Sequence, residues 1–166
     1  PSGVTGTMYH VNGSGGNNSN NGQSWADAFA TVQKALDAAA AGDTIWIAKG
    51  RYVPSEDRNG STASNRSRYR TFVLKDSVQI YGGFDGNEPR NYDISLRDFV
   101  ANETILSGDI NGNDGSNFSN TGDNTYNVVA ALSVGSTTIL DGVTISGGNA
   151  SGSGTPQAVY YNGFRA

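Results

Sequence analysis

Apolar and polar residues alternate along several short stretches of this chain, and two of the stretches repeat each other. Residues 73–83 read as an apolar strand, a tight Asp-Ser corner, a second alternating strand and a Gly-Gly exit. Residues 139–148 repeat that order one residue shorter, and fainter versions begin at residues 42, 104 and 126. Ile80, Ile105 and Val128 are separated by 25 and 23 residues, which are periods typical of stacked β architectures. The pattern predicts an all-β solenoid.

A helical period appears once, near the N-terminus. Apolar residues recur there at spacings of three and four, at Trp25, Phe29, Val32 and Leu36. Ser24 and Asp27 form a shortened capping box, and Gly42 is suited to end a helix. We therefore expect an amphipathic helix over residues 24–41. It would cap the first coil, whose backbone groups and apolar cross-section are otherwise exposed.

The length of 166 residues fits one domain. We expect an N-terminal tail and first strand in residues 1–23, the capping helix in 24–41 and the coils with external loops in 42–148. A linker and a C-terminal strand would occupy residues 149–166. At about 23 residues per coil, the body would hold about four to five coils.

Composition narrows the function classes further. The net charge is −4, which disfavours nucleic acid as a partner because phosphate binding needs clustered positive charge. Cysteine is absent, so disulfides and thiolate metal sites are excluded. No apolar run approaches 18 residues, so no membrane span is predicted. The chain begins at Pro1 without a visible leader, and its Gly-rich, Lys-poor composition suits a secreted or surface protein, either processed or a fragment.

Several segments together resemble a known family. They are YHVN at 9–12, SWADA at 24–28, VQKAL at 32–36, GDTIWIAKGRY at 42–52, IYGGF at 80–84 and LDGVTISGG at 140–148. These segments are similar to the N-terminal region of bacterial secreted right-handed parallel β-helix proteins, including surface proteins of the polymorphic outer-membrane type. The resemblance implies a short right-handed parallel β-helix of the pectin-lyase-like superfold. That superfold hosts lyases, hydrolases, adhesins and structural spikes, so the fold leaves the function open.

The candidate chemistry is weak. Asp109, Asn111, Asn113 and Asp114 place oxygen ligands as a calcium loop would, but Gly falls one place late and Asn120 stands where a bidentate acid is expected. An Asn/Gly turn is the favoured interpretation, so no cofactor is expected and calcium stays an alternative. His10 is the only histidine and is interpreted as a structural strand residue. No constellation supplies a base, an acid and an oxyanion or metal site, so we expect no enzyme.

Surface chemistry offers further candidates. Trp46 and Tyr81 alternate with core isoleucines and could stack on sugar rings, although burial under the helix or a loop is favoured. Arg66, Arg68 and Arg70 could face an anionic polysaccharide, but a solvated loop is the favoured interpretation. Seven Asn-x-Ser/Thr sequons are candidate glycosylation sites: Asn12, Asn17, Asn59, Asn65, Asn102, Asn117 and Asn149.

The leading functional hypothesis is a non-enzymatic secreted structural protein, a subunit of an extracellular filament or surface assembly. Its partners would be copies of itself joined head to tail, since a heterologous contact that does not close produces a fibre. Strand donation from a terminus is the expected joint, through Thr7, Tyr9, Val11, Val159, Tyr161 and Phe164. The alternatives are an adhesion or carbohydrate-binding module of a larger surface protein, with extracellular polysaccharide as the partner, and a fragment of a polysaccharide lyase.

Overall fold

The structure, a computed structural model, describes residues 6–151 of the chain. Within that range it contains the α-helix α1 (Val32–Ala38) and short 3-10 segments η1 (Ser64–Tyr69), η2 (Ile94–Leu96), η3 (Ser116–Phe118) and η4 (Thr121–Asp123). The strands are β1 (Met8–Val11), β2 (Thr44–Ala48), β3 (Gly50–Tyr52), β4 (Phe72–Leu74), β5 (Gln79–Phe84), β6 (Thr104–Ser107), β7 (Val129–Ala131), β8 (Ile139–Asp141) and β9 (Thr144–Ser146).

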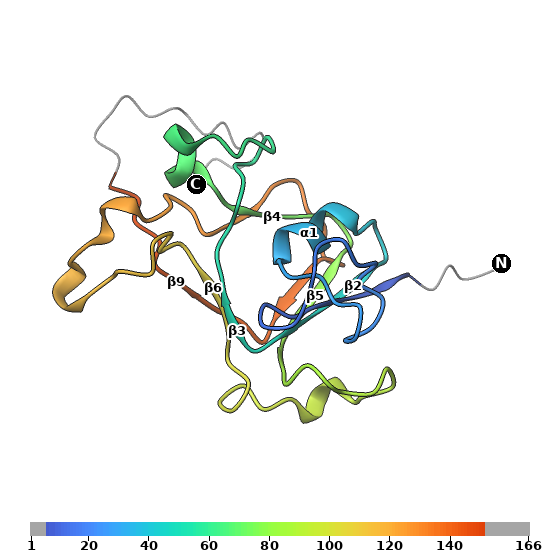
Figure 1. Ribbon diagram of the computed structural model, residues 1–166. Helices are drawn as coiled ribbons and strands as arrows, with labels where there is room; N and C mark the ends of the chain where they lie inside the picture. The colour runs from blue at the N-terminus through green and yellow to red at the C-terminus, as the bar shows by residue number, and fades with distance from the viewer. Residues whose placement is uncertain (1–5, 152–166) are drawn as a thin grey trace.

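All strand pairs are parallel, and the strands divide among three sheets (Figure 1). The first sheet has the order β1-β2-β5-β8, the second β3-β6-β9 and the third β4-β7. From β2 onward, successive strands enter the three sheets in turn. Neighbours in one sheet therefore come from distant parts of the chain, as in the first sheet, where Ile45, Ile80 and Leu140 are in register.

Apolar side chains from the three sheets and from α1 form one core. Ile45 and Ile80 of the first sheet, Leu106 of the second, Phe72 of the third and Leu36 of α1 are each at most 1% exposed. Full burial of a side chain of this size contributes roughly 1.5–3 kcal/mol. The core therefore holds together sheets that contain only two to four strands.

The prediction of an all-β, right-handed parallel β-helix of about four to five coils is wrong. The domain is a mixed α/β fold whose strands lie in three separate parallel sheets, not a closed solenoid. The sheets hold four, three and two strands, so the coils are incomplete. Long segments between the strands, at 53–71, 85–103 and 108–128, carry 3-10 turns and loops that interrupt the regular succession of strands.

The helix is shorter than the predicted range of 24–41. Ser24 and Asp27 do exchange the expected hydrogen bonds, with the Asp27 amide donating to the Ser24 hydroxyl at 3.1 Å, but they form a turn. Phe29 pairs with Val11 in extended conformation, and α1 begins only after Thr31, whose hydroxyl accepts from the Lys34 amide. Pairing with β1 therefore overrode the local helical pattern. Within residues 6–151 no helix is long and apolar enough to cross a membrane.

The sequence repeat is not the repeat of the three-dimensional structure. Residues 73–83 run from the third sheet into the first, whereas residues 139–148 run from the first into the second. What the two stretches share is the corner, where Ser77 and Gly142 have positive φ angles of 58° and 70°. The repeat therefore reports a common way of turning from one sheet to the next, not equivalent positions in a sheet.

Candidate functional site

Trp46, a candidate for sugar stacking for which burial was the favoured interpretation, lies in a buried aromatic cluster. Trp46 is 3% exposed, and its ring stacks on Phe84 with centroids 4.5 Å apart. The His10 ring meets the Trp46 and Trp25 rings edge-on, at 5.8 and 4.7 Å. The Nδ1 atom of His10 donates to the Gly22 carbonyl at 3.2 Å, and burial lowers the pKa of His10 below its ordinary value. Both predicted residues thus serve packing, and the Trp46 ring is out of reach of a ligand.

Tyr81, the second candidate for sugar stacking, is covered by an arginine. The Arg97 guanidinium lies 5.2 Å from the centre of the Tyr81 ring, and the Tyr81 hydroxyl donates to Gln79 at 3.2 Å. Stacking of a sugar on that ring would require Arg97 to leave.

Arg97 is the centre of a polar and aromatic cluster that sequence reasoning missed. Its side chain is 5% exposed and donates to the carbonyls of Ile94 at 2.7 Å and Gly82 at 2.8 Å. A third bond reaches the Asp141 carboxylate at 2.6 Å. The guanidinium also lies against three rings, those of Tyr81, Phe84 and Phe99. Arg97 therefore fastens the loop after β5 to the corner between β8 and β9.

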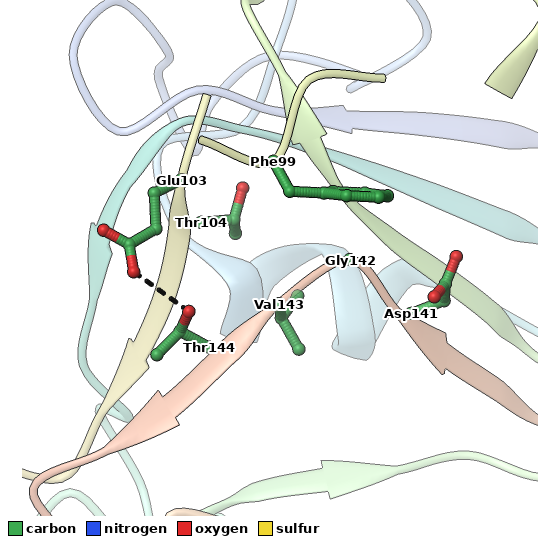
Figure 2. A pocket seen from close by; sticks show the side chains of 7 residues that line it. All are labelled: Phe99, Glu103, Thr104, Asp141, Gly142, Val143 and Thr144. Atoms are coloured by element: carbon green, nitrogen blue, oxygen red, sulfur yellow. Dashed lines mark hydrogen bonds between the residues drawn. The ribbon is translucent and has the colours of Figure 1, made fainter. Parts of the chain in front are cut away.

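A pocket of about 280 Å³ lies beside this cluster (Figure 2). Its lining residues come from the end of the loop before β6 and from the β8–β9 corner: Phe99, Glu103, Thr104, Asp141, Gly142, Val143 and Thr144. Figure 2 shows Glu103 and Asp141 at opposite ends, with the Phe99 ring seen edge-on between them and above Val143. Phe99 is 49% exposed, so the pocket has an accessible aromatic wall.

The polar groups of the pocket are partly engaged by the protein. The Thr144 hydroxyl donates to one oxygen of Glu103 at 3.0 Å, and Arg97 donates to one oxygen of Asp141. Within residues 6–151 the other oxygen of each carboxylate accepts no hydrogen bond. The two carboxylates therefore lie at opposite ends of the pocket, and each has one oxygen fixed by the protein.

The candidate calcium loop, for which an Asn/Gly turn was the favoured interpretation, is held by its own first residue. Asp109 is buried and accepts from the backbone amides of Gly112 at 2.8 Å, Asn113 at 3.1 Å and Asp114 at 3.3 Å, while Arg51 lies 3.5 Å away. Burial alone would raise the pKa of Asp109, but these amides and the guanidinium outweigh it and leave the pKa below its ordinary value. The oxygens of Asp109 thus bind backbone donors. Between residues 6 and 151 no three His, Asp or Glu side chains converge as metal ligands would.

The remaining candidate ligands, Asn111, Asn113 and Asp114, are exposed. The Asn111 amide donates to Asp123 at 3.0 Å, and the Asp114 carboxylate accepts from Asn124 at 2.8 Å. These contacts close the loop on itself.

The three alternating arginines each bind the protein itself. Arg66 pairs with the buried Asp57 at 2.6 Å, and Arg68 lies 4.3 Å from the centre of the Tyr126 ring. Their other acceptors are carbonyls, those of Asn124 and Asn149 for Arg68 and that of Thr62 for Arg70. The segment consequently ties neighbouring loops together.

The predicted glycosylation sites differ in exposure. Asn17, Asn59, Asn65 and Asn117 are exposed, whereas Asn12, Asn102 and Asn149 are partly buried. Asn149 donates to the Thr121 carbonyl at 2.8 Å, so its amide nitrogen is already engaged.

The predicted assembly residues fall into two groups. Thr7, Tyr9 and Val11 belong to the first strand region: the Thr7 carbonyl accepts from the Thr44 amide, and β1 pairs with β2 along its length. Donation of this segment to another chain would require that pairing to break. Val159, Tyr161 and Phe164 lie outside the described residues, as does Ala158 before them.

The two ends of the strand stack differ in how they are covered. At the β1 end, the His10 amide donates to the Gly22 carbonyl at 2.6 Å and the Asn12 amide to the Phe29 carbonyl at 2.9 Å, so residues 12–31 close that edge. At the opposite end, no strand within residues 6–151 pairs with the outer sides of β7, β8 and β9. Along one register position, Tyr52 is 5%, Leu106 1% and Ile145 52% exposed. We call the outer side of β8 and β9 the open edge.

Comparison with known proteins adds no family to this picture. No protein-family model matches the chain, and no curated protein or solved structure matches it either.

Proposed function

We propose that this chain is a non-enzymatic structural protein whose copies associate through the open edge. The observation that carries the proposal is the exposure of Ile145. It continues an apolar position that is buried in β3 and β6, and it is half exposed because, among the strands of residues 6–151, β9 pairs with β6 alone. A strand from a second copy that paired with β9 would bury Ile145 as Tyr52 and Leu106 are buried.

Within residues 6–151, the β9 part of the open edge lacks the devices that proteins use to keep strand edges apart. Such edges are usually protected by lysine, proline, a bulge or a covering segment. β9 has the sequence Thr144-Ile145-Ser146, which carries no charge and no proline. Burying the exposed half of Ile145 would contribute about 1 kcal/mol, and each added ladder hydrogen bond about as much again. The open edge is therefore suited to weak association that accumulates over several contacts.

The geometry favours contact between two open edges. Head-to-tail joining would place the open edge of one copy against the β1 end of the next, where residues 12–31 already use the backbone groups. Two open edges related by a two-fold axis meet without displacing any strand of residues 6–151. An extracellular assembly would then be built from such pairs, with further contacts between them.

The absence of an enzymatic role is part of the proposal. It is supported by the use of the polar side chains in residues 6–151. His10 is packed between two Trp rings, and Asp57 and Asp109 accept backbone amides. These groups stabilise loops and strands.

The test is the mass of the full-length chain in solution, measured by light scattering after size exclusion up to roughly 100 µM, where weak contacts become populated. The proposal predicts that the mass rises with concentration and that Ile145→Lys stays at the mass of one chain. Phe118→Lys is the matched control, because Phe118 is 90% exposed and belongs to η3, not to β8 or β9. A single-chain mass at every concentration, or association of Ile145→Lys equal to the wild type, would refute the proposal.

A further inference from the structure

We infer that the Tyr52 hydroxyl protects Asn12 from deamidation, at one of four Asn-Gly pairs that the fold guards by binding the glycine amide. The inference is independent of self-association, because Asn12 and Tyr52 do not belong to the open edge. Asparagine followed by glycine is especially prone to this reaction, because glycine has no side chain to hinder the attack. The sequence contains five such pairs, and four of them lie within residues 6–151.

The reaction is an attack of the backbone on the neighbouring side chain. The glycine amide nitrogen loses its proton and forms a bond to Cγ of the asparagine, and the Cγ–Nδ2 bond breaks. The side-chain nitrogen leaves as ammonia, which takes up that proton, and water then opens the cyclic imide to aspartate or isoaspartate. A hydrogen bond from the neutral glycine N–H disfavours loss of its proton, so it should slow the first step.

Each of the four glycine amides has an acceptor within the protein. The acceptor is a backbone carbonyl at two pairs, a carboxylate at one and a hydroxyl at one. They are the Asp27 carbonyl for Gly22 at 2.8 Å, the Asp57 carbonyl for Gly60 at 2.9 Å, Oδ1 of Asp109 for Gly112 at 2.8 Å and the Tyr52 hydroxyl for Gly13 at 3.1 Å. The fold therefore engages the attacking nitrogen at every Asn-Gly pair in residues 6–151.

The side chain of Asn12 is folded back over the backbone that would attack it. Its Oδ1 atom accepts from the amides of Ser14 at 3.0 Å and Gly15 at 3.2 Å. These bonds polarise the side-chain carbonyl and keep it beside the turn that begins at Gly13. With the side chain held there, the bond from the Gly13 amide to Tyr52 opposes the reaction.

Tyr52 is fixed as an acceptor for that amide. Its side chain lies in the core, and its hydroxyl donates its one proton to the Ala48 carbonyl at 2.9 Å, which leaves the lone pairs for the Gly13 amide. Burial raises the pKa of Tyr52 above its ordinary value, so the hydroxyl keeps its proton in mildly alkaline buffer. The hydroxyl thereby links β3 to the turn after β1.

Deamidation at Asn12 would alter the segment that closes the β1 edge. The Asn12 amide donates to the Phe29 carbonyl at 2.9 Å, and the Asn12 carbonyl accepts from the Gly16 amide at 2.8 Å. Isoaspartate adds a methylene group to the backbone at this point, so the two hydrogen bonds could not both keep their present geometry. The Tyr52 hydroxyl therefore preserves the closure of that edge.

The experiment incubates the full chain, either folded in mildly alkaline buffer or unfolded in urea, and follows deamidation of Asn12, Asn21, Asn59 and Asn111 by peptide mapping with mass spectrometry. In the folded wild type, each residue should react at least about fivefold more slowly than in the unfolded chain, the factor expected for one hydrogen bond. Tyr52→Phe removes only the hydroxyl, and it should speed deamidation of Asn12 about fivefold and leave the other three rates unchanged.

Two controls separate protection by the hydroxyl from a general loss of stability. The other three pairs report unfolding within the same Tyr52→Phe molecule, and Tyr81→Phe, which removes a hydroxyl bound to Gln79, should leave the Asn12 rate unchanged. Hydrogen exchange of the Gly13 amide tests the bond in the wild type itself. The inference is overturned if Asn12 reacts equally fast in the folded and unfolded wild type, if Tyr52→Phe leaves its rate unchanged or raises all four rates alike, or if the Gly13 amide exchanges as fast as in the unfolded chain.

Discussion

Replacement of Arg97 by alanine should destabilise the domain far more than replacement of its ion-pair partner. Arg97 is 5% exposed at its side chain, whereas Asp141 is 52% exposed. If the ion pair were the main contribution, both substitutions would cost the same. The structure instead places most of the contacts of Arg97 on carbonyls and rings.

The magnitude follows from those contacts. The buried Gly82 carbonyl would lose its 2.8 Å bond from Arg97, at a cost of about 1–3 kcal/mol. Loss of cation–π contacts with rings at 5.0 to 5.6 Å adds about 0.5–1 kcal/mol each. Because such contributions are not additive, we expect a total of about 3 kcal/mol for Arg97→Ala. Asp141→Ala should cost about 0.5 kcal/mol, because its carboxylate is half exposed and the Arg97 guanidinium keeps its two carbonyl acceptors.

Urea unfolding, followed by the fluorescence of the Trp25 and Trp46 cluster, measures these differences through the midpoint and slope. The double variant Arg97→Ala/Asp141→Ala should match Arg97→Ala to within about 0.5 kcal/mol. Arg97→Lys keeps the charge but not the planar fork, so it should recover only part of the loss. Equal costs for Arg97→Ala and Asp141→Ala, or a cost below about 1 kcal/mol for Arg97→Ala, would refute the reasoning.

Three further predictions concern pH and packing. Because burial holds the folded-state pKa of His10 below 6.5, the wild type should lose stability as pH falls below that value, and His10→Gln should not; equal urea midpoints at pH 7.5 and 5.5 would contradict this. Burial alone would raise the pKa of Asp57, but backbone amides and a guanidinium lower it below 3.8. The stabilisation that Asp57 provides is therefore present above about pH 4 and lost in stronger acid. In acid unfolding monitored by circular dichroism, the stability of Asp57→Asn should fall less between about pH 4 and stronger acid than that of the wild type. Gly82→Ala would place a methyl group 2.5 Å from the Gly142 carbonyl oxygen and should cost about 2–3 kcal/mol in urea, whereas Gly122→Ala, with nothing within 4 Å, should be nearly neutral.

Short-range patterns in the sequence predicted strands well and their pairing poorly. Ile45, Ile47 and Ile80 alternate with other residues as a strand requires, and all three are buried. Register partners such as Ile45, Ile80 and Leu140 lie 35 and then 60 residues apart, because loops of unequal length separate them. Such spacing has no visible period. The apparent period through Ile80 and Ile105 joins residues that lie in different sheets.

The N-terminal helix failed as a prediction for a related reason. Phe29 occupies a helical position in the sequence pattern, yet its amide donates to the His10 carbonyl at 2.9 Å and its backbone is extended beside Val11. Pairing between residues far apart in the chain determined the backbone conformation of Phe29. Local helix propensity does not include such contacts. The hydrogen bonds expected of a capping box do form between Ser24 and Asp27, but they close a turn and no helix begins there.

The candidate site was largely invisible in the sequence. Arg97 stands in a charged excursion that reads as a solvated loop, and nothing in the local pattern indicates that its side chain is buried. Trp46 and Tyr81 were candidates for sugar stacking because they are aromatic residues in predicted strands. The accessible ring belongs instead to Phe99, which lies in a loop. Apolar Leu96, Phe99 and Val100 flank Arg97 in an otherwise polar segment, but all three are exposed, so they do not indicate that Arg97 is buried.

The unequal ends of the strand stack bear on how far an assembly could grow. Residues 12–31 already use the backbone groups at the β1 edge of the first sheet, whereas the outer sides of β8 and β9 have no strand partner within residues 6–151. When two copies meet at their open edges, each covers β8 and β9 of the other, and the two β1 edges face outward. Growth through the first sheet then stops at the pair, because the β1 edge offers no unpaired groups for the repeated strand addition that leads to cross-β fibrils.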